Sequence, residues 1–199
     1  DNATDLVASM IVEALGEMGN IKAVTVLLTR MHDAPTPLRN IIVKAIVKIM
    51  GGKSLTLLTQ KQREEFRQYM LVALQDEDVA IQDAAIQGLA YVGGEHATRA
   101  VLALGAALDP DHDVERLDLA VQSLGAIGRN PALEEALAQG DPARAKVAVW
   151  ACRRMKDGQA VELLSKAFWE KDRDLQREII QALTQVADES CREFFLDVL

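Results

Sequence analysis

Two cysteines and three histidines are the side chains of this sequence best suited to nucleophilic or metal chemistry. Cys152 falls on an apolar helical stripe, where a buried and unreactive role is expected. Cys191 opens the last helical segment, where a helix N-terminus lowers the pKa of a thiol, but no histidine lies near it in sequence. The histidines are isolated from one another, at His32, His96 and His112. We therefore predict no catalytic residues, no metal site and no cofactor.

An acidic segment, "DPDHD", has the alternating aspartates of a calcium loop at Asp109, Asp111 and Asp113. The glycine and glutamate that complete an EF-hand loop are missing downstream. A pair of aspartates stands in the same frame at Asp76 and Asp78. The segment is therefore expected to cap a helix rather than to bind calcium.

The residue types that favour protein binding gather around Trp150. It lies between Lys146 and Arg154, with Arg153 beside it. Tryptophan and arginine are enriched among the residues that anchor protein interfaces. Two interpretations stay open, an outward-facing Trp150 that meets a partner or a Trp150 that fills a groove between helices.

The elements that would position these residues come from one motif that recurs along the chain. Each copy has apolar residues one, four and seven positions before an anchor, and a small residue five before it. The spacing is helical. The anchors are Gly19, Met50, Gly93, Gly128, Lys156 and Ala187. Repeats of roughly 20–50 residues indicate stacked helical units.

Local signals predict where these helices begin and end. A residue that can cap a helix stands fifteen before five anchors, at Thr4, Asp78, Asp113, Asp141 and Asp172. The remaining copy has Pro35-Thr36-Pro37 there. An insertion is expected near 51–60, followed by a capping box at Thr59 and Gln62. Small residues are expected to let neighbouring helices approach closely, at Ala14, Ala45, Gly88, Ser123, Ala151 and Ala182.

Composition limits the function classes. The 199 residues are 49% hydrophobic but only 4% aromatic, a mixture that favours packed helices. A net charge of -8 repels phosphate backbones, so no nucleic acid is expected as partner. No apolar run reaches the ~18 residues needed to cross a bilayer, so no direct membrane insertion is expected. Two cysteines make no disulfide framework, which predicts a cytoplasmic location.

The segments "DEDVAIQDAAIQGLAYVG" (76–93) and "DHDVERLDLAVQSLGAIG" (111–128) resemble HEAT repeats, in particular the short bacterial type also seen in phycobilin lyase subunits. The resemblance covers essentially the whole chain. It implies an all-α, right-handed α-α superhelix (a HEAT/armadillo-like solenoid) of about five to six two-helix repeats. It also implies one repeat domain over 1–199, which is expected to be a fragment of a longer protein.

Family members are mostly scaffolds that bind proteins on the concave face, so the resemblance implies a non-enzymatic scaffold or adaptor. One alternative is a phycobilin lyase-like subunit that binds a tetrapyrrole and its acceptor protein. Another is a nucleic-acid binder similar to HEAT-like glycosylases, for which the basic residues Arg39, Lys44, Lys48, Lys53, Lys61, Arg63 and Arg67 are candidates. The repeated His-Glu iron ligands of HEAT-like hydroxylases are missing. The family's arginine eleven before the anchor is present only as Arg39.

At about 100° per residue, the positions two, six and ten before each anchor face away from the packed stripe. The partner-binding residues predicted on this row and beside it are Gln87, Tyr91, Gln122, Lys146, Trp150, Arg153, Arg154 and Gln181. The final helical segment, "EFFLDVL", is too apolar for a polar terminal cap. It predicts an end-to-end association through the C-terminal helix.

Overall fold

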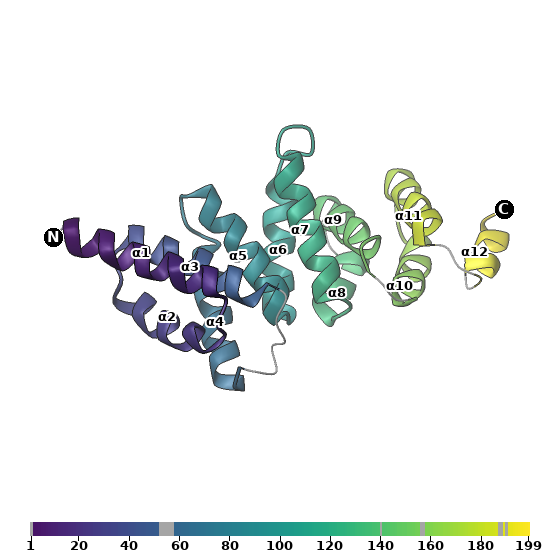
Figure 1. The fold of residues 1–199 in the computed structure, drawn as a ribbon. Coiled ribbons are helices and arrows are strands. Elements are labelled where there is room, and N and C mark those ends of the chain that lie inside the picture. The colour runs from purple at the N-terminus through teal and green to yellow at the C-terminus, as the bar shows by residue number, and fades with distance from the viewer. Residues whose placement is uncertain (1, 52–57, 140, 156–157, 187–188, 190) are drawn as a thin grey trace. The chain divides into compact units, whose positions relative to one another are not determined.

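A computed structural model describes residues 2–51, 58–139, 141–155, 158–186, 189 and 191–199, and within these ranges the chain is all-helical with twelve helices and no strand (Figure 1). The chain divides into two compact units, 1–92 and 93–199. The single repeat domain expected over 1–199 stays a prediction. The first unit contains α1 (Asn2–Met18), α2 (Lys22–Asp33), α3 (Thr36–Met50), α4 (Gln60–Ala73) and α5 (Val79–Val92).

The second unit contains α6 (Glu95–Ala107), α7 (Val114–Ile127), α8 (Pro131–Gln139), α9 (Pro142–Cys152), α10 (Gln159–Phe168), α11 (Arg173–Val186) and α12 (Cys191–Val198). We call the odd-numbered helices, each of which ends at or a few residues before an anchor, anchor helices, and the even-numbered ones intervening helices. The anchors Lys156 and Ala187, and residues 52–57 of the expected insertion, lie outside the described residues.

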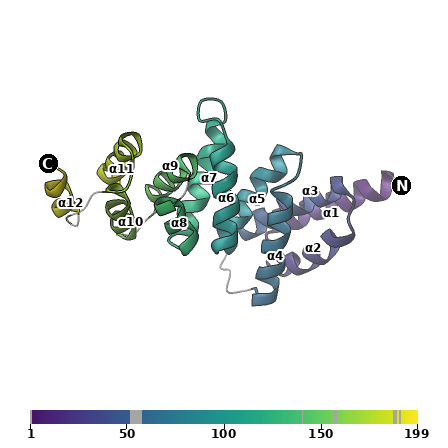
Figure 2. The ribbon, with the colours of Figure 1, turned by 180° about the vertical axis from the view of Figure 1, so that it is seen from behind.

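Within each unit the two kinds of helix form two rows. In the first unit α3 packs against α1 and α5, and α2 packs against α4. In the second unit α9 packs against α7 and α11, while α8 packs against α6 and α10. Figures 1 and 2 show α9 and α11 above α8 and α10 from both sides. Neighbouring helices therefore pack in the order that the repeat predicts, and the all-α class is confirmed.

Most of the predicted helix starts are confirmed. The N–H of Ala80 donates to Asp78, that of Arg144 to Asp141 and that of Leu175 to Asp172, at 2.8–3.0 Å. α3 begins at Thr36 after Pro35, and the Thr59–Gln62 capping box is complete.

One predicted start is wrong, and another is at the predicted residue but lacks the cap bond. Thr4 lies inside α1, which begins at Asn2. Asp113 precedes α7 but makes no cap bond, because its carboxylate accepts the N–H of Asp109 at 3.0 Å instead. The Asp113 carboxylate thus bonds to an N–H of the turn and not to an N–H of the first turn of α7.

The predicted end of α5 at Gly93 is confirmed. Gly93 has φ +60°, a left-handed conformation that glycine adopts without the steric cost of a side chain. Gly128 ends α7 in the same way with φ +80°.

The small residues behave as predicted in five of the six copies. Ala45, Gly88, Ser123, Ala151 and Ala182 are buried. Ala14 is exposed, so its prediction is wrong, and α1 uses Gly16 as its close contact instead. A Cβ on Gly16 would lie 3.2 Å from the Cα and Cβ atoms of Ala45 on α3.

The position eleven before the anchor also has a structural role. Arg39 donates to the carbonyl of Ala34 at 3.2 Å. Gln82 donates to the carbonyl of Asp76 at 2.6 Å, and Gln176 to that of Phe168 at 3.1 Å. A glutamine thus reaches back to the preceding turn where the resemblance implies an arginine, and the acceptor is a backbone oxygen.

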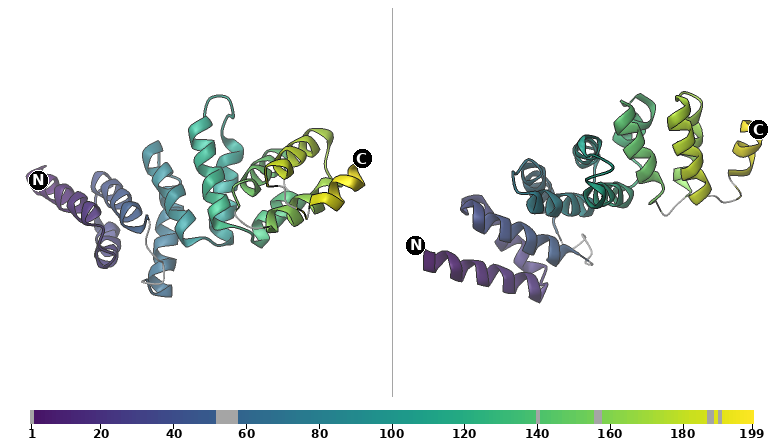
Figure 3. Two further views of the ribbon diagram at one scale, coloured as in Figure 1. Left: turned by 45° about the vertical axis from the view of Figure 1, so that its right-hand side comes forward. Right: turned by 90° about the horizontal axis from the view of Figure 1, so that it is seen from above.

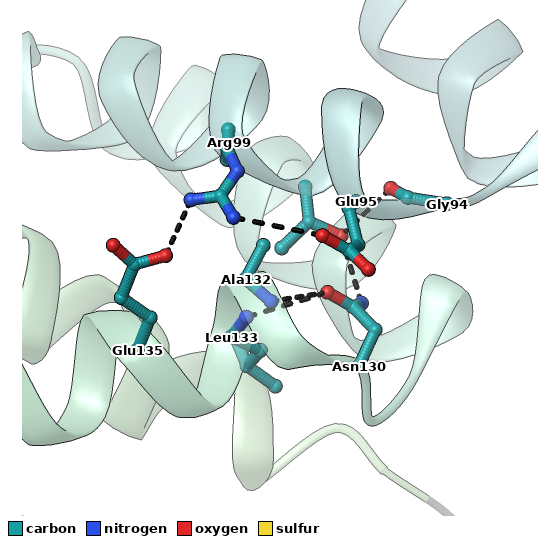
Figure 4. Close-up of polar contacts among 8 residues, drawn as sticks. Gly94, Glu95, Arg99, Asn130, Ala132, Leu133 and Glu135 are labelled. Carbon is teal, nitrogen blue, oxygen red and sulfur yellow. Dashed lines mark hydrogen bonds and ion pairs between the residues drawn. The ribbon is translucent and has the colours of Figure 1, made fainter.

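A polar network joins α6 to α8 (Figure 4). Asn130 caps α8 by accepting the N–H groups of Ala132 and Leu133, and its amide donates to the buried Thr98 hydroxyl at 2.9 Å. Arg99 pairs with Glu135 on the next intervening helix. This network links the two helices.

The C-terminal helix packs on the end of α10 through aromatic rings. Phe194 lies edge-on to Phe168 with ring centroids 5.3 Å apart, and Trp169 is 6.4 Å from Phe194. Phe194 is therefore buried, whereas Leu196 and Leu199 are exposed. The apolar segment "EFFLDVL" is therefore partly buried within its own unit and partly exposed.

Candidate functional site

Several of the predicted partner-binding residues lie on three neighbouring helices of the second unit, α7, α9 and α11. Gln122, Trp150 and Gln181 occupy the same motif position, six before the anchor, on these three packed helices. Gln122 and Gln181 are exposed, as the helical spacing predicts, whereas Trp150 is half-buried. We call the surface formed by Asp118, Gln122, Lys146, Trp150, Arg154, Glu178 and Gln181 the tryptophan face.

Trp150 is held in place by Glu178 of α11. Its indole N–H donates to Glu178 Oε2 at 2.8 Å. Lys146 Nζ lies 3.3 Å from the other oxygen of Glu178 and 5.1 Å from the centroid of the Trp150 ring, within range of a cation–π contact. Trp150 thus bonds to a neighbouring helix and is still partly exposed, and its contact with a partner stays a prediction.

A second ion pair holds the other edge of the tryptophan face. Arg154 Nη2 lies 2.5 Å from Asp118 Oδ1, and the Gln122 amide donates to the other oxygen of Asp118. These residues join α7 to α9, as Lys146 and Glu178 join α9 to α11. Two ion pairs and two hydrogen bonds therefore link the side chains of this face across the three helices.

Beside Arg154 the surface opens into a groove of about 880 Å³. Gly125 and Gly128 are among its lining residues, with open space where a side chain on Gly128 would lie, and Ile127 and Met155 supply apolar contact. Its polar groups are Gln122, Arg129, Arg154 and Gln159. Amides that both donate and accept hydrogen bonds, beside guanidinium groups, can bind a peptide backbone and a carboxylate.

The structure does not place all eight predicted residues on one surface. Gln87 and Tyr91 belong to α5 of the first unit. Gln87 is exposed, and Tyr91 is half-buried with its hydroxyl 3.1 Å from the position of a Cβ on Gly51. Arg153 is half-buried at the end of α9.

Glu178 is the residue of this surface that the sequence analysis missed. It lies nine before its anchor, outside the outward row, and no motif marks it. The one sequence feature that could have indicated it is its position, about one repeat after Lys146 and Trp150. There a carboxylate on the next anchor helix can pair with the lysine and accept the indole N–H.

The two cysteines considered for chemistry are both buried. Burial raises the pKa of the Cys152 thiol to about 12, which confirms its predicted buried position. Cys191 is also buried, although it begins a helix. Among the described residues, no group of three or more His, Cys, Asp or Glu side chains is placed to hold a metal ion.

The acidic turn before α7 is closed on itself. Asp109 accepts the N–H of Asp111 at 2.8 Å and contacts His112 Nδ1 at 2.9 Å. The N–H of Asp111, and then the His112 ring, lower the pKa of Asp109. These carboxylate oxygens stabilise the turn.

The basic residues proposed for nucleic acid mostly contact the protein itself. Arg63 donates to the carbonyl of Leu58, Arg67 to that of Val92, and Lys48 pairs with Glu17. Lys53 lies outside the described residues. No helix in the described part of the chain combines the length and apolar character of a membrane span.

Comparison with known proteins adds no family assignment. The sequence matches no protein-family model and no curated protein at a significant level.

Proposed function

We propose that the chain is a HEAT-like repeat scaffold whose tryptophan face binds a segment of another protein. The proposal includes a right-handed solenoid in which this face is concave. The observation that carries it is the half-buried Trp150, held by Glu178 and Lys146 beside a groove with two arginines.

The arrangement suits binding because its charged groups are already paired. The pairs Lys146–Glu178 and Arg154–Asp118 hold four charged side chains in one geometry. Because these side chains are already ordered, the face loses less side-chain entropy when a partner binds than a mobile surface would. Trp150 offers a large aromatic area at the centre, which is where interface energy concentrates.

The groove indicates what kind of segment would fit. Ile127 and Met155 favour an apolar side chain, and the amides of Gln122 and Gln159 can satisfy peptide N–H and C=O groups. Arg154 can exchange Asp118 for a carboxylate of the partner, because it stays half exposed at 51%. We expect an extended segment that carries one apolar and one acidic side chain.

Crosslinking capture from a lysate of the source organism tests the proposal. Wild type is compared with Arg154→Glu and with the matched control Arg99→Glu, since Arg99 is 52% exposed and also pairs with a carboxylate on a neighbouring helix. Captured proteins are identified by mass spectrometry and titrated in purified form. We expect one partner that Arg99→Glu retains and that Arg154→Glu binds at least about tenfold more weakly.

Trp150→Ala supplies a second variant, after circular dichroism shows that it remains folded. Equal binding of the purified partner by wild type, Arg154→Glu and Trp150→Ala would overturn the assignment of this face. The absence of any captured partner would overturn it as well.

A further inference from the structure

Four helices of the first unit surround a small cavity. α2 packs against α3 and α4, and α5 also packs against α3 and α4. Figure 3 shows α4 and α5, in blue, joined by a short turn. The cavity has a volume of about 180 Å³, and Met31, Val43 and Ile81, each at most 2% exposed, line it from α2, α3 and α5. Its inner wall is therefore apolar.

Two opposite charges line the same cavity and do not pair with each other. Arg39 of α3 donates from Nη2 to the carbonyl of Ala34, and its other N–H groups are left for another acceptor. Asp76, in the turn between α4 and α5, accepts the N–H of Asp78 with Oδ1 at 2.9 Å, which leaves Oδ2 for another donor. Within the described part of the chain, neither side chain forms an ion pair. A ligand with one anionic and one cationic group can bridge them through charge-assisted hydrogen bonds.

Two neutral polar residues add hydrogen-bonding capacity to the cavity. Asn40 of α3 and Tyr69 of α4 line it, and both are half-buried. Their side chains have no hydrogen-bond partner among the residues that the structure describes. An amide and a phenol can each donate and accept, and a purely apolar ligand that covered them would leave them unsatisfied at a cost in free energy. The cavity therefore favours a ligand with a polar head and an apolar body.

The volume of the cavity limits the size of that ligand. About 180 Å³ is the space of roughly six water molecules, at about 30 Å³ each. Pockets that hold drug-sized molecules measure about 300–1,000 Å³. A nucleotide cofactor is therefore too large, whereas one aliphatic side chain with two charged groups at its head fits.

We propose that this cavity binds a free α-amino acid with an aliphatic side chain of about the size of leucine. The α-carboxylate pairs with Arg39, the α-ammonium group pairs with Asp76, and the side chain contacts Met31, Val43 and Ile81. A carboxylic acid alone would lie beside Asp76 without a cation to offset the repulsion, and an amine alone would lie beside Arg39 without an anion. The cavity belongs to the first unit, so the proposal does not rest on partner binding at the tryptophan face.

Isothermal titration calorimetry of the whole chain with L-leucine tests the proposal. We expect saturable binding of one leucine per chain. Three analogues each lack one feature of leucine: 4-methylpentanoate has no ammonium group, 3-methylbutylamine has no carboxylate, and glycine has no side chain. Each should bind at least about tenfold more weakly, because a site that pairs with a ligand group discriminates against an analogue without that group, and because glycine buries no apolar surface.

Two variants assign the binding to the cavity. Asp76→Asn removes the charge but keeps an oxygen that can accept the N–H of Asp78. Arg39→Gln installs the residue type found at the equivalent positions of α5 and α11, where the glutamine side chain still donates to a carbonyl that precedes its helix. Each variant should bind leucine at least about tenfold more weakly. In Asp76→Asn the loss of the ammonium group should then matter little, and in Arg39→Gln the loss of the carboxylate should matter little, since the partner of each group is gone.

Matched controls remove the same charges outside the cavity. Asp78→Asn lies in the same turn as Asp76, and Lys44→Gln lies at an exposed position of α3, the helix of Arg39. Both should bind leucine as wild type does. Circular dichroism establishes that every variant is folded.

Three results would overturn the proposal. If leucine does not bind at millimolar concentration, the cavity is not an amino-acid site. If Asp76→Asn and Arg39→Gln bind leucine as tightly as wild type, leucine binds elsewhere on the chain. If N-acetyl-leucine amide, which has neither charge, binds as tightly as leucine, the cavity takes the side chain of a peptide and not a free amino acid.

Discussion

The two units each place a glycine at a crowded helix contact, but opposite different neighbours. A Cβ on Gly88 of α5 would lie 2.6 Å from Met70 Sδ and 3.1 Å from Phe66 Cζ. A Cβ on Gly125 of α7 would lie 2.5 Å from the Cβ of Arg154 and 3.2 Å from the Ala151 carbonyl oxygen. The first contact is with side-chain atoms, and the second is with the carbonyl of Ala151 in α9 and with the Cβ and backbone of Arg154 in the turn that follows α9.

The Gly88 contact can therefore adjust by moving a side chain, whereas the Gly125 contact determines how closely α7 and α9 approach. Methionine has three rotatable bonds and adapts to irregular space. The end of α9 and the turn that holds Arg154 have no such freedom, and a shift of this backbone would displace Arg154 in the tryptophan face. The spacing of α7 and α9, and so the geometry of the proposed binding surface, depends on Gly125.

The largest effect is therefore expected for Gly125→Ala. Overpacking costs typically about 1–3 kcal/mol and can cost more against backbone, while alanine regains about 1 kcal/mol of helix propensity. We expect a net loss of about 2 kcal/mol in the free energy of unfolding, measured by urea denaturation. Ala126→Ser, at the exposed neighbouring residue, is the control and should be near neutral. An unchanged stability of Gly125→Ala would show that α7 and α9 can separate freely.

Asn130→Ala tests whether polar contacts set helix spacing as strongly as the glycine does. The change removes the cap of α8 and the hydrogen bond to buried Thr98. A lost cap costs typically about 1 kcal/mol and a lost hydrogen bond about another 1 kcal/mol, so we expect 1–2 kcal/mol, about the same or less than for Gly125→Ala. Asn130→Asp, which keeps the cap acceptor, should recover part of the loss. If Asn130→Ala lowered the free energy of unfolding by less than Asn130→Asp does, the stabilising role of the network would be contradicted.

Cys152 tests how well the core around α9 excludes water. Its folded-state pKa is raised, so its contribution to stability is complete below the unfolded value near 9.0 and is lost as pH rises from there through about 12. Within this window, the free energy of unfolding should fall by about 1.4 kcal/mol per pH unit more in wild type than in Cys152→Ala. Parallel pH profiles of the two proteins would show that solvent reaches the thiol.

Gly88→Ala should have the smallest effect. Displacement of Met70 costs stability, but the gain of about 1 kcal/mol in helix propensity offsets it, so the net change should stay within about 1 kcal/mol. In a Met70→Ala background the obstacle is gone, and Gly88→Ala should become stabilising. A cost as large as that of Gly125→Ala would remove the distinction between the two contacts.

Much of the local structure could be predicted because its signals are local. Gly93 ends α5 by its own conformation, and Asp141 and Thr59 cap the helices that follow them. The position of Trp150 could not be predicted, because its hydrogen-bond acceptor, Glu178, lies 28 residues further on, on another helix.

The sequence by itself determined the all-helical class, the repeat and most helix ends, since caps, glycines and apolar spacing act within a few residues. Only the tertiary structure decided which faces are covered. Ala14 and Ala45 share one motif position, yet Ala14 is exposed and Ala45 is buried. Burial depends on whether a neighbouring helix is present, and the motif is the same in both cases.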